Sequence, residues 1–81
     1  MRYAANTYIV MQEFVTNKVN DLRTQAGQTQ EELADEVGVS RQTIIAIEKG
    51  NYTPSVLLAL KIAAHFKQSV EKVFILSGKR S

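Results

Sequence analysis

The residues between Ser40 and Gly50 could recognise the edges of DNA bases. At about 100° per residue, a helix starting near Ser40 would place Ile44 and Ile47 on one side. Its other side would carry Arg41 at the leading end, then Gln42, Ile45, Ala46 and Lys49. Arginine pairs with guanine, glutamine pairs with adenine, and an alanine methyl group contacts the thymine methyl. The same side chains also fit an ordinary solvated helix face, so the pattern indicates base recognition only together with its surroundings.

Two short helices joined by a tight turn would position these side chains. Thr29 followed by Glu32 predicts a capping box at the start of the first helix. Gly38 is expected to end that helix, because glycine suits a left-handed C′ position best, and Ser40 can cap the second helix. The first helix would bury one apolar face, made of Leu33, Ala34 and Val37. Such a pair of amphipathic helices is typical of a helix-turn-helix, which offers its second helix to a DNA groove.

This stretch, continued to Phe74, resembles the Cro/CI-type (Xre-like) helix-turn-helix family of phage and prokaryotic regulators. The matching segments read LRTQAG, TQEELADEVGVSRQTIIAIEKG, TPSVLLALKIAAHF and SVEKVF. They occur in the right order and at the right spacing over about residues 18 to 76. The resemblance implies an all-α, five-helix, lambda-repressor-like DNA-binding domain. It also implies that the helix starting near Ser40 enters the major groove.

The resemblance extends to individual residues. It implies that Arg41, Gln42 and Ala46 read bases, and we place Ile45 with them. It implies that Gln30 binds a phosphate near the start of the first of the two helices. The other residues that we expect at the DNA backbone are Thr29, Thr43, Lys49, Asn51 and Tyr52, although Tyr52 could equally pack over its own loop. The resemblance also implies a partly buried ion pair between Arg23 and Glu48.

The segments outside this resemblance are harder to interpret. Residues 1–15 form an N-terminal extension that could be a short strand, by the alternation of residues 7–10, or a helix lined by Tyr8, Met11 and Val15. It could also be an arm packed on the domain or on a second subunit, or an incidental stretch before a start at Met11. We expect residues 16–76 to be the helix-turn-helix domain, with Thr16 capping its first helix, and residues 77–81 to be a basic tail.

The helix expected from about Ser55 to Phe66 is apolar around most of its circumference. We expect its core face to be Val56, Ala59, Leu60, Ala63 and Phe66, and the core face of the last helix to be Val70, Val73 and Phe74. A surface helix of a monomer should show a polar face, so a second subunit is expected to cover the excess. The predicted interface of this twofold dimer is Leu57, Ala64, Phe74, Ile75 and Leu76.

Composition narrows the class of protein. Eighty-one residues form one small domain, which buries only about 60% of its unfolded surface, so dimerisation would help it. There is no cysteine and no apolar run near the roughly 20 residues that span a bilayer, so we expect a cytoplasmic protein, associated with the nucleoid when bound to DNA. Four acids lie at residues 31–36, and the rest of the chain then carries a net charge of +6, as a phosphate-binding surface requires.

These observations predict a sequence-specific regulator of transcription that binds double-stranded DNA. We expect a repressor-like dimer on a pseudo-palindromic operator, with recognition helices roughly 34 Å apart. The alternative is a protein-interaction role, such as an antitoxin that also binds its own promoter, and only the N-terminal extension suggests it. An enzyme is not expected, because the sequence has no nucleophile–base set, glycine-rich phosphate loop or metal cluster beside its lone His65. We expect no cofactor, metal or small-molecule effector.

Overall fold

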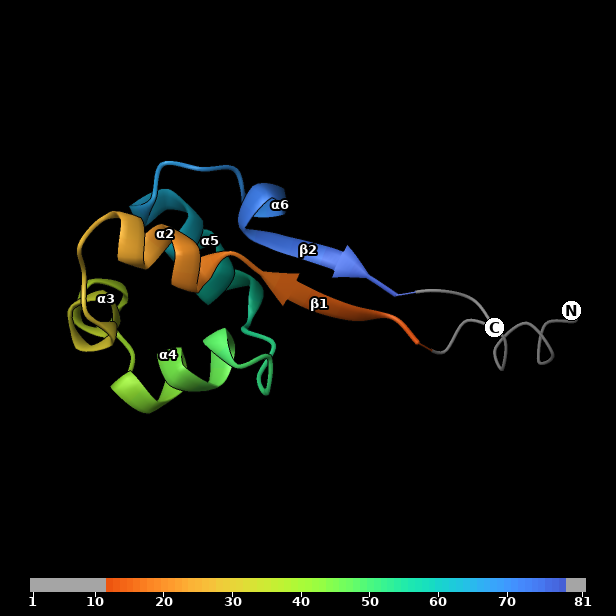
Figure 1. The fold of residues 1–81 in the computed structure, drawn as a ribbon, viewed down its shortest axis with the longest axis horizontal. Helices are drawn as coiled ribbons and strands as arrows, with labels where there is room; N and C mark the ends of the chain where they lie inside the picture. Colours follow the sequence, from red (N-terminus) through yellow and green to blue (C-terminus); the bar gives the residue numbers. More distant parts are fainter. Residues whose placement is uncertain (1–11, 79–81) are drawn as a thin grey trace, which may run out of the picture.

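Five helices and two strands occupy residues 12–78, the part of the chain that the computed structural model describes (Figure 1). In chain order they are β1 (Phe14–Asn17), α2 (Val19–Gln25), α3 (Gln30–Val37), α4 (Arg41–Glu48), α5 (Val56–His65), α6 (Val70–Val73) and β2 (Phe74–Ser77). The helices gather at one end of the molecule, and the two strands run side by side away from them (Figure 1). None of these helices is long and apolar enough to cross a lipid bilayer.

The two strands correct the expectation of an all-α fold. β1 pairs with β2 in antiparallel register, with Phe14 opposite Ser77 and Asn17 opposite Phe74. The predicted last helix ends at Val73, and Phe74 already has extended backbone angles of φ −118° and ψ 120°. A short apolar run fits a helix and a strand equally well by spacing alone. The aromatic and β-branched residues of both segments favour the extended form once a partner strand is available.

The start of the first helix also differs from the prediction. Thr16 lies in β1 and does not cap a helix, and Val15 lies in the same strand and not on a helix face. Lys18 is the N-cap residue of α2 and makes no side-chain capping bond. The side chain of Asn17 supports the start of the helix, because its Oδ1 accepts the backbone N–H of Val19 at 3.1 Å. Its Nδ2 donates to the carbonyl of Ile47 at 2.9 Å, which ties β1 to the end of α4. Whether residues 1–11 form a strand, a helix, a packed arm or an incidental stretch stays a prediction, because they lie outside the described residues.

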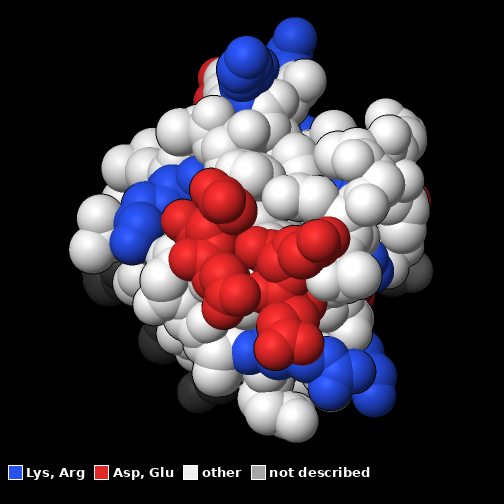
Figure 2. Space-filling view, turned by 90° about the vertical axis from the view of Figure 1, so that its left-hand side faces the viewer, with Lys and Arg blue, Asp and Glu red and all other residues white. Residues whose placement is uncertain are grey.

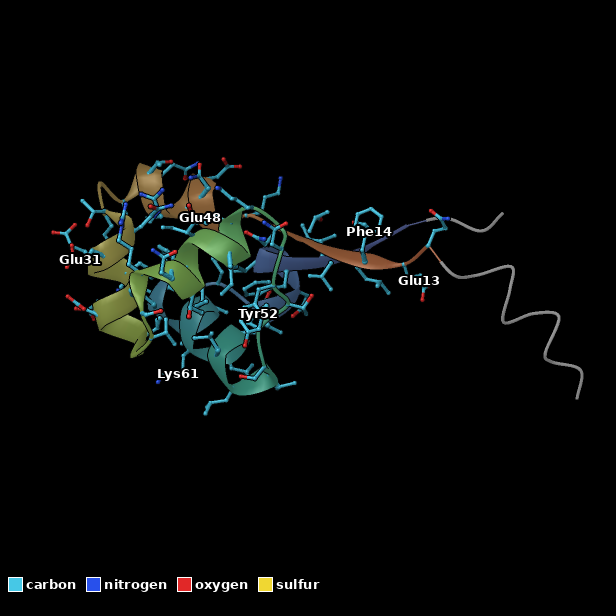
Figure 3. The ribbon with its side chains drawn as sticks, turned by 90° about the horizontal axis from the view of Figure 1, so that it is seen from below. Glu13, Phe14, Glu31, Glu48, Tyr52 and Lys61 are labelled. Carbon is cyan, nitrogen blue, oxygen red and sulfur yellow. The ribbon has the colours of Figure 1, made fainter. Side chains whose placement is uncertain are left out.

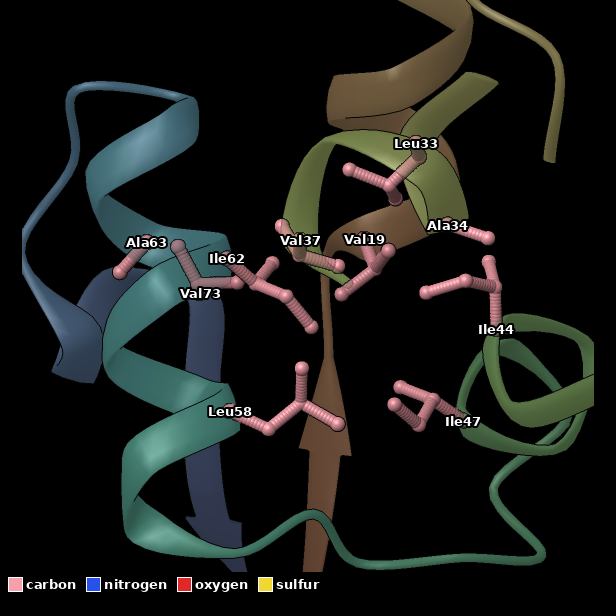
Figure 4. Packing of buried hydrophobic residues seen from close by; sticks show 10 residues of the cluster. All are labelled: Val19, Leu33, Ala34, Val37, Ile44, Ile47, Leu58, Ile62, Ala63 and Val73. Atoms are coloured by element: carbon pink, nitrogen blue, oxygen red, sulfur yellow. The ribbon is translucent and has the colours of Figure 1, made fainter. Parts of the chain in front are cut away.

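The core forms where the helices meet (Figure 4). Its buried residues are Val19, Leu33, Ala34, Val37, Ile44, Ile47, Leu58, Ile62, Ala63 and Val73. This set confirms the predicted inward faces of α3 and α4. The buried side of α4 fixes which of its side chains can point outward, and therefore which of them are available to contact a ligand.

The predicted core face of α5 was partly wrong. Val56 is 76% exposed and Leu60 is 50% exposed, whereas Leu58 and Ile62 are buried. Because α5 carries apolar residues on nearly every side, its periodicity could not identify the inward face. The packing of α5 against α3 and α6 decides the face instead.

Candidate nucleic-acid interface

The turn between α3 and α4 has the local chemistry that the sequence predicted. The Thr29 hydroxyl accepts the Glu32 backbone N–H at 3.0 Å, and the Glu32 carboxylate accepts the Thr29 backbone N–H at 2.9 Å. Gly38 ends α3 in the left-handed conformation, with φ 77°. Ser40 then caps α4, since its Oγ accepts the Thr43 backbone N–H at 3.2 Å. Each end of the turn is therefore fixed by its own residues, and α4 starts at a defined angle.

One side of α4 is anchored and the other is open. Ile44 and Ile47 are fully buried, while Arg41 and Gln42 are exposed. Ile45 is half-buried, as is its neighbour Ala46. Figure 3 looks onto this open side, where α4 lies in front of the other helices. The residues predicted to read bases therefore share the outer surface of one helix, with the two polar side chains at its leading end.

Glu48 lies at the other end of α4 and receives hydrogen bonds from three residues. Arg23 Nε donates to its Oε2 at 2.7 Å and Arg23 Nη2 to its Oε1 at 3.2 Å. Gln30 Nε2 and Asn20 Nδ2 donate to the same Oε1 at 3.0 and 3.1 Å. Arg23 Nη1 also donates to the carbonyl of Gln28 at 2.8 Å. The predicted Arg23–Glu48 ion pair is therefore present, and it links α2, α3 and α4.

These contacts decide the ionisation of both partners. Burial alone would raise the pKa of the Glu48 carboxyl, but the hydrogen bonds from Arg23, Asn20 and Gln30 outweigh it and lower that pKa below its ordinary value of 4.5. The hydrogen bond to Glu48 raises the pKa of Arg23. Glu48 is therefore ionised at neutral pH and holds the charge of Arg23. The sequence offered no signal for the part that Asn20 plays here.

The residues predicted at the DNA backbone lie on two sides of α4. Thr29 and Gln30 line one shallow depression together with Arg41. Lys49, Asn51 and Tyr52 are exposed in the segment after α4, and Asn51 is held there by its backbone N–H, which donates to the carbonyl of Ala46 at 2.9 Å. The remaining one, Thr43, is half-buried within α4, and its hydroxyl lies 3.1 Å from that of Ser40.

Charge is distributed unevenly around this surface. The exposed acids of α3, which are Glu31, Glu32, Asp35 and Glu36, form a continuous negative surface at the α3 end of the molecule (Figure 2). Arg41 and Lys49 lie at the two ends of α4. Within residues 12–78, Arg23–Glu48 is the one pair of opposite charges whose nitrogen and oxygen atoms lie within 4 Å of each other. Neither Arg41 nor Lys49 therefore forms an ion pair at that distance within the described residues.

The apolar residues predicted for a dimer interface do not form one set. Leu57 and Leu76 are 69% and 72% exposed, and Ala64 is exposed, whereas Phe74 and Ile75 are half-buried. The structure adds three exposed residues that the sequence did not assign to an interface: Phe14, Val56 and Leu60. Val56, Leu57 and Leu60 share the outer side of α5, and we call them the α5 apolar patch.

No group of three or more histidines, cysteines or carboxylates is arranged to hold a metal within residues 12–78.

Comparison with known proteins identifies the family. A family model described as Helix-turn-helix matches residues 19–73, which span α2 to α6. The chain belongs to the Xre/Cro–CI-like helix-turn-helix family. The uncharacterized HTH-type transcriptional regulator YgzD of Bacillus subtilis is 57% identical over 60 residues, which cover 74% of this chain and 91% of the relative. The cryptic phage CTXphi transcriptional repressor RstR of Vibrio cholerae is 35% identical over 51 residues, covering 63% of this chain and 46% of its own.

Solved structures agree with this family. The restriction-modification controller protein C.AhdI of Aeromonas hydrophila superposes with a TM-score of 0.64 at 29% identity, covering 68% of this chain and 83% of its own. The transcriptional regulator VanUg superposes with a TM-score of 0.69 at 21% identity, covering 85% of this chain and 92% of its own. At this identity the similarity supports only the fold. The chain is a transcriptional regulator with a DNA-binding helix-turn-helix, in a family that is not an enzyme class.

Proposed function

We propose that the protein is a sequence-specific repressor that binds a pseudo-palindromic operator as a twofold dimer. The observation that carries the proposal is the division of α4 into an anchored side and an open side. Ile44, Ile47 and Glu48 hold the helix on the bundle, while Arg41 and Gln42 project from its exposed leading end. Recognition helices of this kind contact base edges mainly through their N-terminal residues. An operator-binding role also places the protein in the cytoplasm, on the nucleoid.

Base reading would follow the chemistry of each side chain. The Arg41 guanidinium can donate two hydrogen bonds to the O6 and N7 atoms of guanine, and the Gln42 amide can pair with adenine. Ala46 and Ile45 lie farther along the same outer surface and would contact thymine methyl groups. Because both are half-buried, they would reach only bases that the helix approaches closely.

Backbone contacts would hold the helix in register without reading sequence. The side-chain amide of Gln30 has two hydrogens. One of them is donated to Glu48, so the second hydrogen is available to a phosphate oxygen. The Thr29 hydroxyl accepts one hydrogen bond in the capping box and keeps its own hydrogen to donate. Lys49, Asn51 and Tyr52 would contact the backbone beyond the C-terminal end of α4. Thr43 would add a weaker contact from within the helix.

Dimerisation would cover the exposed apolar residues. The α5 apolar patch carries three large side chains that are each at least half exposed, and clusters of this kind usually mark an interface. Ala64 lies on the same outer side, and Phe74, Ile75 and Leu76 would extend the contact along β2. A twofold axis uses the same patch on both subunits. It would also place the two recognition helices on neighbouring turns of DNA, roughly 34 Å apart.

Selection of random duplex DNA by the purified protein tests this function. We expect a palindromic consensus and binding that weakens steeply with salt, as phosphate contacts require. Arg41→Ala should relax preference at one base pair and cost about 1–3 kcal/mol, while Lys49→Ala should weaken all sequences alike. The two variants are matched, because each removes one exposed cation from one end of the same helix. An Arg41→Ala variant with unchanged base preference would contradict the assignment of base reading.

A further inference from the structure

Lys61 lies on α5, outside every segment to which the sequence assigned a DNA contact. Its Nζ atom is 3.4 Å from the position that a Cβ would take on Gly38. The side chain therefore reaches the turn that joins α3 to α4, although Lys61 follows that turn by more than 20 residues in sequence. Figure 3, which looks onto the open side of α4, shows Lys61 and Tyr52 on one flank of that helix and α2 on the opposite flank.

The charge of Lys61 is available to a ligand. The residue is exposed. Within residues 12–78, Arg23–Glu48 is the one ion pair with a distance of 4 Å or less, so no described carboxylate lies that close to the Lys61 ammonium group. Side chains on a helix tilt toward its N-terminus. In α5 that end adjoins the segment that holds Asn51 and Tyr52. The ammonium group itself lies beside Gly38 at the α3–α4 turn, and Figure 3 shows Lys61 on the same flank of α4 as Tyr52, where backbone contacts are already proposed.

The length of α3 sets the spacing between Lys61 and Gln30. Gln30 is the first residue of α3, and Gly38 follows the last. Eight helical residues at 1.5 Å each make about 12 Å. The major groove of B-DNA is also about 12 Å wide. Phosphate-binding groups at the two ends of α3 would therefore be spaced to reach the two edges of the groove that α4 is proposed to enter.

We propose that Lys61 binds a backbone phosphate beside the α3–α4 turn, across the major groove from the phosphate held by Gln30. This inference rests on the proposed DNA binding and adds a contact that reads no bases. A purely structural role is the competing explanation, because a cation near the last carbonyls of α3 also favours that helix end. The two explanations differ in what they do to salt dependence and to stability.

The test compares Lys61→Gln with Lys61→Arg, which keeps the charge, and with Lys72→Gln, which removes an exposed charge from α6. Affinity is measured for the selected operator and for a random-sequence duplex over a range of salt concentrations. For Lys61→Gln we expect the slope of log K against log salt to become shallower by about 0.9, which is the effect of one phosphate contact. Both duplexes should lose affinity by the same factor. The two control variants should keep the unsubstituted slope, and Lys61→Gln should keep the unsubstituted unfolding midpoint.

The remaining outcomes decide between these explanations. An unchanged slope for Lys61→Gln overturns the phosphate contact, and an unchanged slope with a lowered unfolding midpoint assigns Lys61 to the end of α3. The random-sequence duplex keeps the two proposals apart. If selection yields no operator but the slope still changes on random duplex, the specific-repressor function fails and the Lys61 contact stands. If the unsubstituted protein binds no duplex at all, both proposals fail.

Discussion

Replacing Glu48 by alanine tests whether one carboxylate holds α4 on the bundle. The Glu48 side chain is only 5% exposed and that of Arg23 is 11% exposed. The substitution removes the acceptor of four side-chain hydrogen bonds that come from α2 and α3. It leaves the Arg23 guanidinium with the carbonyl of Gln28 as its remaining partner. A largely buried charge would then lack its counter-charge.

The expected cost follows from this burial. Removing one partner of a buried ion pair costs about 3–5 kcal/mol. A small domain has a free energy of unfolding of about 5–15 kcal/mol, so Glu48→Ala should remove a large part of it. Each kcal/mol lowers the unfolding midpoint of a domain of this size by about 4–8 °C. The midpoint of the variant should therefore fall by at least about 12 °C.

Urea denaturation of four proteins provides the assay: the unsubstituted chain, Glu48→Ala, Arg23→Met, and the double variant. If the two charged side chains stabilise each other, the double variant should lose less free energy of unfolding than the sum of the losses of the two single variants. Additive losses would refute the reasoning, because they would mean that each residue acts through other contacts. A loss below about 1 kcal/mol for Glu48→Ala, the size typical of an exposed pair, would refute it as well.

The pH dependence of stability gives an independent check on the same residue. The pKa of Glu48 is lowered in the folded protein, so the unfolded chain takes up the proton first as the pH falls. The stabilisation is therefore complete above the ordinary value of 4.5 and is lost as the pH falls toward the lowered folded value. Glu48→Gln should lack this part of the acid dependence. An identical acid profile for the two proteins would show that Glu48 does not contribute to it.

Two further predictions concern the end of α5 and its exposed side. Lys67 has a left-handed backbone, with φ 58°, which costs an ordinary residue about 1–2 kcal/mol. Glycine removes that strain, but the greater conformational entropy that it gives the unfolded chain costs about 0.4–1 kcal/mol. Lys67→Gly should therefore stabilise the fold by between zero and about 1.6 kcal/mol in a urea titration, and destabilisation would contradict the strain. The double variant Leu57→Glu/Leu60→Glu should keep nearly the same unfolding midpoint as a monomer, because both side chains are exposed. It should no longer form a dimer in analytical ultracentrifugation, and a dimer that persists would place the interface elsewhere.

The sequence predicted the helix-turn-helix well because its signals are local. A capping box spans four residues, and a left-handed glycine and a capping serine act within one turn of the chain. The inward faces of α3 and α4 were predictable because both helices alternate clearly between apolar and polar sides. The Arg23–Glu48 pair joins residues 25 positions apart, and it came from the family resemblance and not from the residues alone.

What the sequence missed depends on contacts between distant segments. β1 and β2 are extended because they pair with each other, although their paired residues lie 57 to 63 positions apart in sequence. Neither segment has a strong strand signal of its own. The inward face of α5 depends on its neighbours, since apolar residues surround that helix. Lys61 could not be linked to the α3–α4 turn before the fold placed its ammonium beside Gly38. In each case the local sequence is compatible with more than one conformation or position, and the tertiary packing determines which one is adopted.

In α4 the residues that stabilise the fold differ from those proposed to read bases. Ile44, Ile47 and Glu48 face inward and hold the helix, whereas Arg41 and Gln42 take no part in the core or in the ion pair. Loss of Glu48 should therefore lower the unfolding midpoint while the ranking of DNA sequences stays the same, because Glu48 holds the helix and is not among the residues proposed to read bases. Loss of Arg41 should change the ranking of sequences while the unfolding midpoint stays the same, as expected for an exposed residue. One helix thus carries two sets of residues whose effects can be measured apart.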